Sequence, residues 1–109
     1  MTKKEMCNLL NLLKSAYPLF YSNAKAETMD RVIAVWYEMM GGYDFDTASR
    51  AIKKMIVAET QIPTIALVTT YIAKQRAEDL ERERQANAWR EAGFDSEQEY
   101  LEKISELRR

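Results

Sequence analysis

The sequence predicts an all-α protein, a small bundle of about four short helices followed by a charged C-terminal tail. Apolar residues recur every three or four positions along most of the chain, which is the spacing of one helix face. Only 3 Gly and 2 Pro occur among 109 residues, which disfavours long loops and all-β architectures. Apolar residues make up 47% of the chain, enough for one modest core.

The first helix is expected to begin at Thr2 and to end near Tyr17. Thr2 and Glu5 have the spacing of a capping box, in which each side chain binds the other residue's backbone N–H. Pro18 disfavours a helical conformation for the residue before it. We expect Tyr17 and Phe20 to pack on the core from the following loop. The apolar face of this helix consists of Met6, Leu9, Leu10 and Leu13.

The second helix is expected over residues 26–40. The pair Gly41-Gly42 is expected to end it, because glycine readily adopts positive φ at a helix C-terminus. The residues expected to form its buried stripe are Met29, Val32, Ile33, Trp36, Met39 and Met40.

Two further core helices follow. Asp44 is the expected N-cap of the third helix. The fourth helix begins at Pro63-Thr64, either with proline as its first residue or with threonine as its cap. The apolar residues of the third helix are Ala48, Ala51, Ile52, Met55 and Ile56, and those of the fourth are Ile65, Val68, Tyr71 and Ile72.

The composition changes after Ala73, so we predict a helical core domain over residues 1–73 and a partner-binding tail, helical or disordered, over 74–109. The start of the tail is rich in opposite charges three or four residues apart, as in Glu81 and Arg84. Such a helix is either extended and solvated or frayed, because a helix without a packing face is marginally stable. Gly93 is expected to interrupt it.

The end of the tail carries large apolar side chains. Ser96 and Glu99 repeat the capping-box spacing, which predicts a further helix. This helix either docks on the core as a fifth helix, or stays loose and orders against a partner through aromatic and aliphatic anchors. The candidate partner-binding residues are Trp89, Phe94, Tyr100, Leu101, Ile104 and Leu107.

No pattern in the sequence indicates catalysis, and we expect a protein that is not an enzyme and uses no cofactor or metal. The chain has no histidine, the commonest general base and metal ligand, and no phosphate-binding glycine loop. Cys7 is the only cysteine and is interpreted as a packing residue. Asp44 and Asp46 are interpreted as helix-capping residues, because two carboxylates alone make a weak metal site.

The charge distribution does not favour nucleic-acid binding. The chain has 16 basic and 17 acidic residues, whereas a DNA-binding domain is expected to be basic. Two small basic clusters are interpreted as solvated helix faces because acidic residues interleave with them. The absence of a signal segment or a long apolar run predicts a cytoplasmic protein without a membrane partner. The clusters are Lys3, Lys4 and Lys14, and Arg50, Lys53 and Lys54.

Four motifs occur in an order that resembles the bacteriophage replicative DNA helicase loader/inhibitor family. They are "YPLF", the tryptophan at Trp36, "GYDFDTASRAI" and "IPTIALVTTYI", and together they cover roughly residues 5–73. The family pattern often has two prolines where this chain has Ile62-Pro63. The motif residues are structural rather than catalytic.

The resemblance implies a small, ATPase-free, all-helical adaptor for phage DNA replication. Such a protein binds a hexameric replicative helicase, keeps it inactive, and loads it at an origin through an origin-binding replisome organiser protein. It also implies that the N-terminal region contacts the organiser and the C-terminal region contacts the helicase. Two alternatives remain: a small phage structural or assembly protein that self-associates through its tail, and a small DNA-binding regulator.

Overall fold

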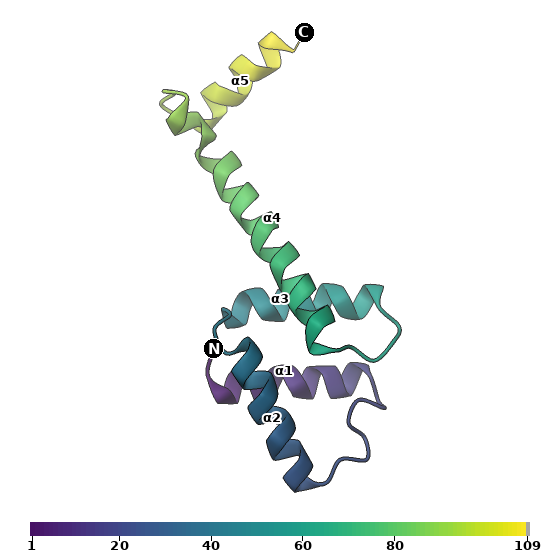
Figure 1. Ribbon diagram of the computed structural model, residues 1–109. Helices are drawn as coiled ribbons and strands as arrows, with labels where there is room; N and C mark the ends of the chain where they lie inside the picture. Colours follow the sequence, from purple (N-terminus) through teal and green to yellow (C-terminus); the bar gives the residue numbers. More distant parts are fainter. Residues whose placement is uncertain (109) are drawn as a thin grey trace. The chain divides into compact units, whose positions relative to one another are not determined.

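The computed structural model describes residues 1–108, and in these residues all regular secondary structure is helical, which confirms the predicted all-α class. The chain forms two compact units, Met1–Gln75 and the residues from Arg76 onward. The helices are α1 (Lys3–Ala16), α2 (Ala26–Met40), α3 (Phe45–Ala58), α4 (Ile65–Glu91) and α5 (Glu97–Leu107) (Figure 1).

Helix α1 has the predicted start and end. The Glu5 backbone N–H donates to the Thr2 hydroxyl at 3.1 Å, and the Thr2 N–H donates to the Glu5 carboxylate at 2.7 Å. Two N–H groups that have no partner within the helix are thereby satisfied. The helix ends at Ala16, and Tyr17 and Phe20 are buried, as predicted.

Helix α1 is the centre of the first unit, where it lies against both α2 and α3 (Figure 1). Two residues of α4, Val68 and Ile72, are buried in the same core. Burying one such aliphatic side chain contributes about 1.5–3 kcal/mol to stability. The fully buried large side chains are Trp36, Phe20, Met6, Leu9, Leu13, Met40, Ile52, Met55, Ile72 and Val68.

Helix α2 covers residues 26–40 as predicted, but its buried face is narrower than predicted. Trp36 and Met40 are buried, whereas Met39 is 59% exposed, so its assignment to the buried stripe is wrong. At 3.6 residues per turn, Met39 lies about 60° to one side of Trp36. The neighbouring helices cover only part of this apolar face.

The turn between α2 and α3 occurs at the predicted glycines for a different reason. Gly41 has φ −60°, and of the glycines only Gly93 has positive φ, so the predicted left-handed conformation is wrong. A Cβ atom on Gly41 would lie 2.6 Å from the Tyr37 carbonyl oxygen. Glycine is therefore required here by close packing. The Met1 ammonium group donates to the carbonyls of Gly41 and Tyr43, at 2.7 and 3.0 Å.

Helix α3 begins at the predicted cap, where the Thr47 backbone N–H donates to the Asp44 carboxylate at 3.1 Å. For α4 the structure selects the threonine cap, because the Leu67 N–H donates to the Thr64 hydroxyl at 3.2 Å. Pro63 precedes this cap and is buried. Helix α4 has 27 residues, so of the two alternatives for the charged segment the structure takes the extended, solvated helix.

Helix α4 continues through the charged segment and ends at the predicted break. Gly93 has φ 86°. Its N–H donates to the Arg90 carbonyl at 3.1 Å, and the Phe94 N–H donates to the Trp89 carbonyl at 2.9 Å. This pair of hydrogen bonds is the Schellman motif of a helix C-terminus. Helix α5 then begins at Ser96, whose hydroxyl accepts from the Glu99 N–H at 3.2 Å.

Candidate functional site

The two carboxylates considered as metal ligands in the sequence, Asp44 and Asp46, both make hydrogen bonds within α3 and its cap. Within residues 1–108, no group of three or more metal-ligating side chains lies close enough together to hold an ion. Asp44 caps α3, and the Asp46 carboxylate accepts from the Arg50 Nε at 2.9 Å. Over the same residues, no helix has the length and apolar character needed to span a bilayer.

The basic clusters do not form a continuous positive surface. Arg50 is paired with Asp46 on the same helix, while Lys53 and Lys54 are exposed. Lys3 and Lys4 lie in the first turn of α1 and Lys14 in its last, so the length of the helix separates them. A long basic track for a nucleic-acid backbone is therefore not present on these helices.

Of the six tail residues predicted to bind a partner, Trp89 and Phe94 lie at the end of α4 and the turn after it, and the other four lie along α5. The rings of Phe94 and Tyr100 pack edge to face with their centroids 5.4 Å apart. The Arg90 guanidinium lies 5.0 Å from the centre of the Trp89 ring. These contacts lie within the second unit and position two of the aromatic side chains against each other.

A groove of about 330 Å³ opens between the C-terminal part of α4 and one side of α5, along the length of α5. Leu101 lines this groove and is 55% exposed, and Leu107 is 85% exposed beyond it. Solvent-exposed aliphatic side chains beside a groove are a common form of protein-binding surface. The residues lining the groove are Gln85, Ala88, Glu97, Tyr100, Leu101, Ile104 and Arg108.

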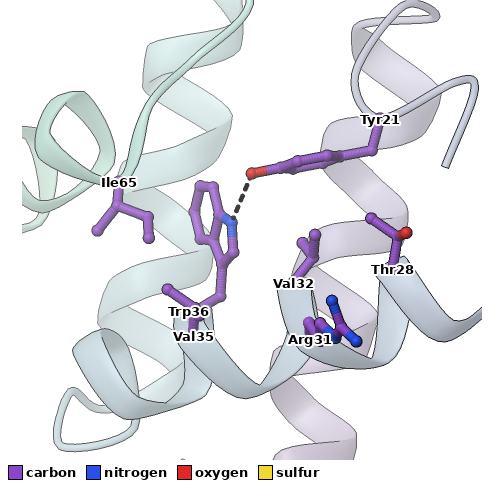
Figure 2. A pocket seen from close by; sticks show the side chains of 7 residues that line it. All are labelled: Tyr21, Thr28, Arg31, Val32, Val35, Trp36 and Ile65. Carbon is purple, nitrogen blue, oxygen red and sulfur yellow. Dashed lines mark hydrogen bonds between the residues drawn. The ribbon is translucent and has the colours of Figure 1, made fainter.

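A second recess, of about 210 Å³, lies on the first unit along the exposed flank of α2 and was not predicted from the sequence. Figure 2 shows the Trp36 indole in its wall, where the Nε1–H donates to the Tyr21 hydroxyl at 3.3 Å. A volume this small fits one apolar side chain rather than a cofactor, since ligand pockets usually reach about 300–1,000 Å³. Its lining residues are Tyr21, Thr28, Arg31, Val32, Val35, Trp36 and Ile65.

The sequence does carry a signal for this recess. Val35 lies on the same flank of α2 as Met39 and was not among the residues expected to be buried, and it is 47% exposed. The apolar face of α2 is thus wider than one core-facing stripe. The core of the first unit covers only part of such a wide apolar face, so one flank of the helix remains exposed.

Two tyrosines donate hydrogen bonds to Glu59, the first residue of the loop between α3 and α4. The Tyr17 hydroxyl donates to the Glu59 carbonyl, and the Tyr71 hydroxyl donates to the Glu59 carboxylate, both at 2.9 Å. Burial, and then the nearby Glu59 carboxylate, raise the pKa of Tyr17. The hydrogen bond to Glu59 is the main reason that the pKa of Tyr71 is raised as well. Both shifts favour neutral tyrosines that can donate these hydrogen bonds.

Comparison with known proteins gives one family. No curated protein and no solved structure matches the chain. A family model for the N-terminal domain of the phage helicase loader/inhibitor gp39P matches residues 1–69, which cover α1, α2, α3 and the first residues of α4. The match spans more than half of the 109 residues and includes nearly all of the motif residues that carried the resemblance. The chain belongs to the phage helicase loader/inhibitor family.

Proposed function

We propose that the protein is an adaptor that binds a hexameric replicative helicase, keeps it inactive, and loads it at a phage origin. In this proposal an origin-binding organiser protein recruits the adaptor, and the process takes place in the host cytoplasm. The observation that carries the proposal is the family match over residues 1–69.

We assign helicase binding to the tail, which lies outside the matched residues. Leu101 and Leu107 are exposed aliphatic side chains, and Trp89 is a partly buried aromatic one in the same unit. Large apolar side chains of this kind dominate the binding energy of many interfaces. The first unit then remains available for the organiser.

Native mass spectrometry of the full chain with the hexameric replicative helicase tests the proposal. We expect a complex of adaptor and hexamer, and a helicase ATPase rate that falls as the adaptor is added. A chain ending at Gln75 retains the first compact unit and is expected to lose the complex. If the full chain forms no complex with the helicase, the proposal is wrong.

Substitutions in the full chain test the role of the tail. We expect Trp89→Ala and Leu101→Ala each to weaken helicase binding about tenfold, in line with the loss of interface anchors. Leu80→Ala is the matched control, because Leu80 is 63% exposed but does not line the groove. The melting temperature of the first unit should stay unchanged in all three variants. A large fall for Trp89→Ala or Leu101→Ala would instead indicate a tail docked on the core.

A further inference from the structure

The exposed flank of α2 has the pattern of a coiled-coil face. Its residues Thr28, Val32, Val35 and Met39 are spaced by four, three and four positions, which is the a/d spacing of a heptad. Val35 and Met39 are 47% and 59% exposed and Thr28 is also exposed, whereas Val32 is half-buried against the core, so the first unit leaves most of this stripe uncovered. We call these four residues the α2 stripe.

The charged residues beside the α2 stripe are complementary to the same residues of a second, antiparallel copy of the chain. Arg31 and Glu38 lie seven residues apart, both at the g position of that heptad, and both are exposed. Neither forms an ion pair with another residue of the described part of the chain. In an antiparallel pair of helices, g positions face g positions. An antiparallel second copy centred near Val35 would therefore place Arg31 of each chain opposite Glu38 of the other.

We propose that the α2 stripe is the interface of a symmetric antiparallel dimer of this chain. The recess beside the stripe is lined by Thr28, Val32 and Val35 and can take one aliphatic side chain from the second copy (Figure 2). A two-fold axis near Val35 repeats each contact, so one opposite-charge pair becomes two. The complementary charges at Arg31 and Glu38 identify a second copy as the occupant.

The dimer is weak and reversible, because the stripe extends over only about three turns of one helix. Interfaces smaller than the usual 1,200 Å² belong to transient complexes. We expect a dissociation constant on the order of 100 μM. Sedimentation equilibrium of the full chain, over concentrations on both sides of that value, measures it. Val35→Glu is expected to leave the chain monomeric, because it brings two carboxylates close together near the centre of the interface.

Charge reversal tests the antiparallel pairing specifically. Arg31→Glu and Glu38→Arg each turn both attractive pairs into repulsive ones, and each is expected to weaken the dimer about tenfold. Mixing the two variants in equal amounts should restore association, because in the heterodimer the introduced glutamate of one chain faces the introduced arginine of the other. Asp30→Lys is the matched control, since Asp30 is exposed on the far side of α2 and its change should have no effect.

The proposal is overturned by any of three results. These are a full chain that stays monomeric throughout the concentration range, association that persists in Val35→Glu, and an equal mixture of the charge variants that stays as weak as either alone. Circular dichroism melting of each variant shows that the fold is retained. Because no helicase is present, these results are independent of the proposed loading function.

Discussion

At the scale of single residues, the neighbouring glycines 41 and 42 are equivalent in the sequence but differ in the structure. A Cβ atom on Gly41 would lie 2.6 Å from the Tyr37 carbonyl oxygen, whereas one on Gly42 would meet nothing within 4 Å. We expect Gly41→Ala to reduce the free energy of unfolding by about 1–3 kcal/mol, as overpacking does. Thermal or urea denaturation measures this loss.

Gly42→Ala is the control for that experiment. Its backbone has negative φ and open space, so the substitution should be neutral or stabilise by up to about 1 kcal/mol through the unfolded chain. Equal effects at the two positions would contradict the steric explanation.

The hydrogen bond from Tyr17 to the Glu59 carbonyl predicts a dependence of stability on alkaline pH. The pKa of Tyr17 is raised in the folded protein from the ordinary value of 10.0. The stabilisation is therefore fully present below about pH 10 and is lost as the pH rises through the folded-state pKa. We expect melting temperatures above pH 10 to fall less steeply in Tyr17→Phe than in the parent chain.

The same variant isolates the hydrogen bond itself at neutral pH. Removing the hydroxyl leaves the partly buried Glu59 carbonyl without this donor, which should cost about 1 kcal/mol. If the parent and Tyr17→Phe have the same pH profile, another group causes the alkaline loss.

Capping residues were the most predictable single residues, because their role depends only on neighbours in the sequence. Thr2 with Glu5, and Asp44, make the hydrogen bonds that their spacing predicts. Met39 was not predictable in the same way. Its exposure depends on which helices cover the flank of α2, and this is a property of the tertiary packing.

At the scale of helices, α4 is packed against the core at its start and exposed to solvent further along. Its first residues, such as Val68 and Ile72, are buried in the core, whereas residues 80–87 are exposed. In that stretch the Glu81–Arg84 ion pair, at 3.5 Å, is a contact between exposed side chains and contributes little. The middle of α4 therefore depends on intrinsic helix propensity.

Glycine substitutions in two helices compare local with global stability. Ala77→Gly in exposed α4 should lower local helix stability by about 1 kcal/mol, seen as faster amide hydrogen exchange around residue 77. Ala51→Gly in buried α3 should lower the melting temperature of the whole first unit. A fall in the melting temperature for Ala77→Gly as large as that for Ala51→Gly would show that this part of α4 is coupled to the core.

The turn before α5 offers a test of backbone conformation alone. Gly93 has φ 86° and open space around its Cβ position, so Gly93→Ala introduces strain without a clash. We expect a cost of about 1–2 kcal/mol, confined to the second unit. The chemical shifts of Phe94 and Tyr100, whose rings are in contact, should change while those of the core stay constant.

The sequence predicted where each helix begins better than how far α4 continues. Start signals such as Thr64 act through hydrogen bonds to the next few residues. Continuation beyond Ala73 depends on the balance between helix propensity and conformational entropy in a segment with few packing contacts. The periodicity of apolar residues gives no information on that balance.

At the scale of the whole molecule, the family could be predicted because many of its motif residues form the core. The tail lies outside the matched region, so its part in helicase binding stays a prediction, as does the division of roles between residues 1–73 and 74–109. The contact between Phe94 and Tyr100 required the geometry of the turn. The recess on α2 required knowledge of which apolar residues the core leaves uncovered.

Helix α4 includes residues of both units, and its helical conformation protects the chain between them from proteases. Arg76, Arg82 and Arg84 lie inside α4, where the backbone is held in helical hydrogen bonds and does not fit an extended protease cleft. Cutting the chain between its units therefore requires α4 to unwind first. When unwinding and rewinding are fast relative to cleavage, the rate of tryptic cleavage measures the fraction of molecules in which this part of α4 is unwound. Any partner that binds the helical form of α4 would lengthen the lifetime of the uncut chain.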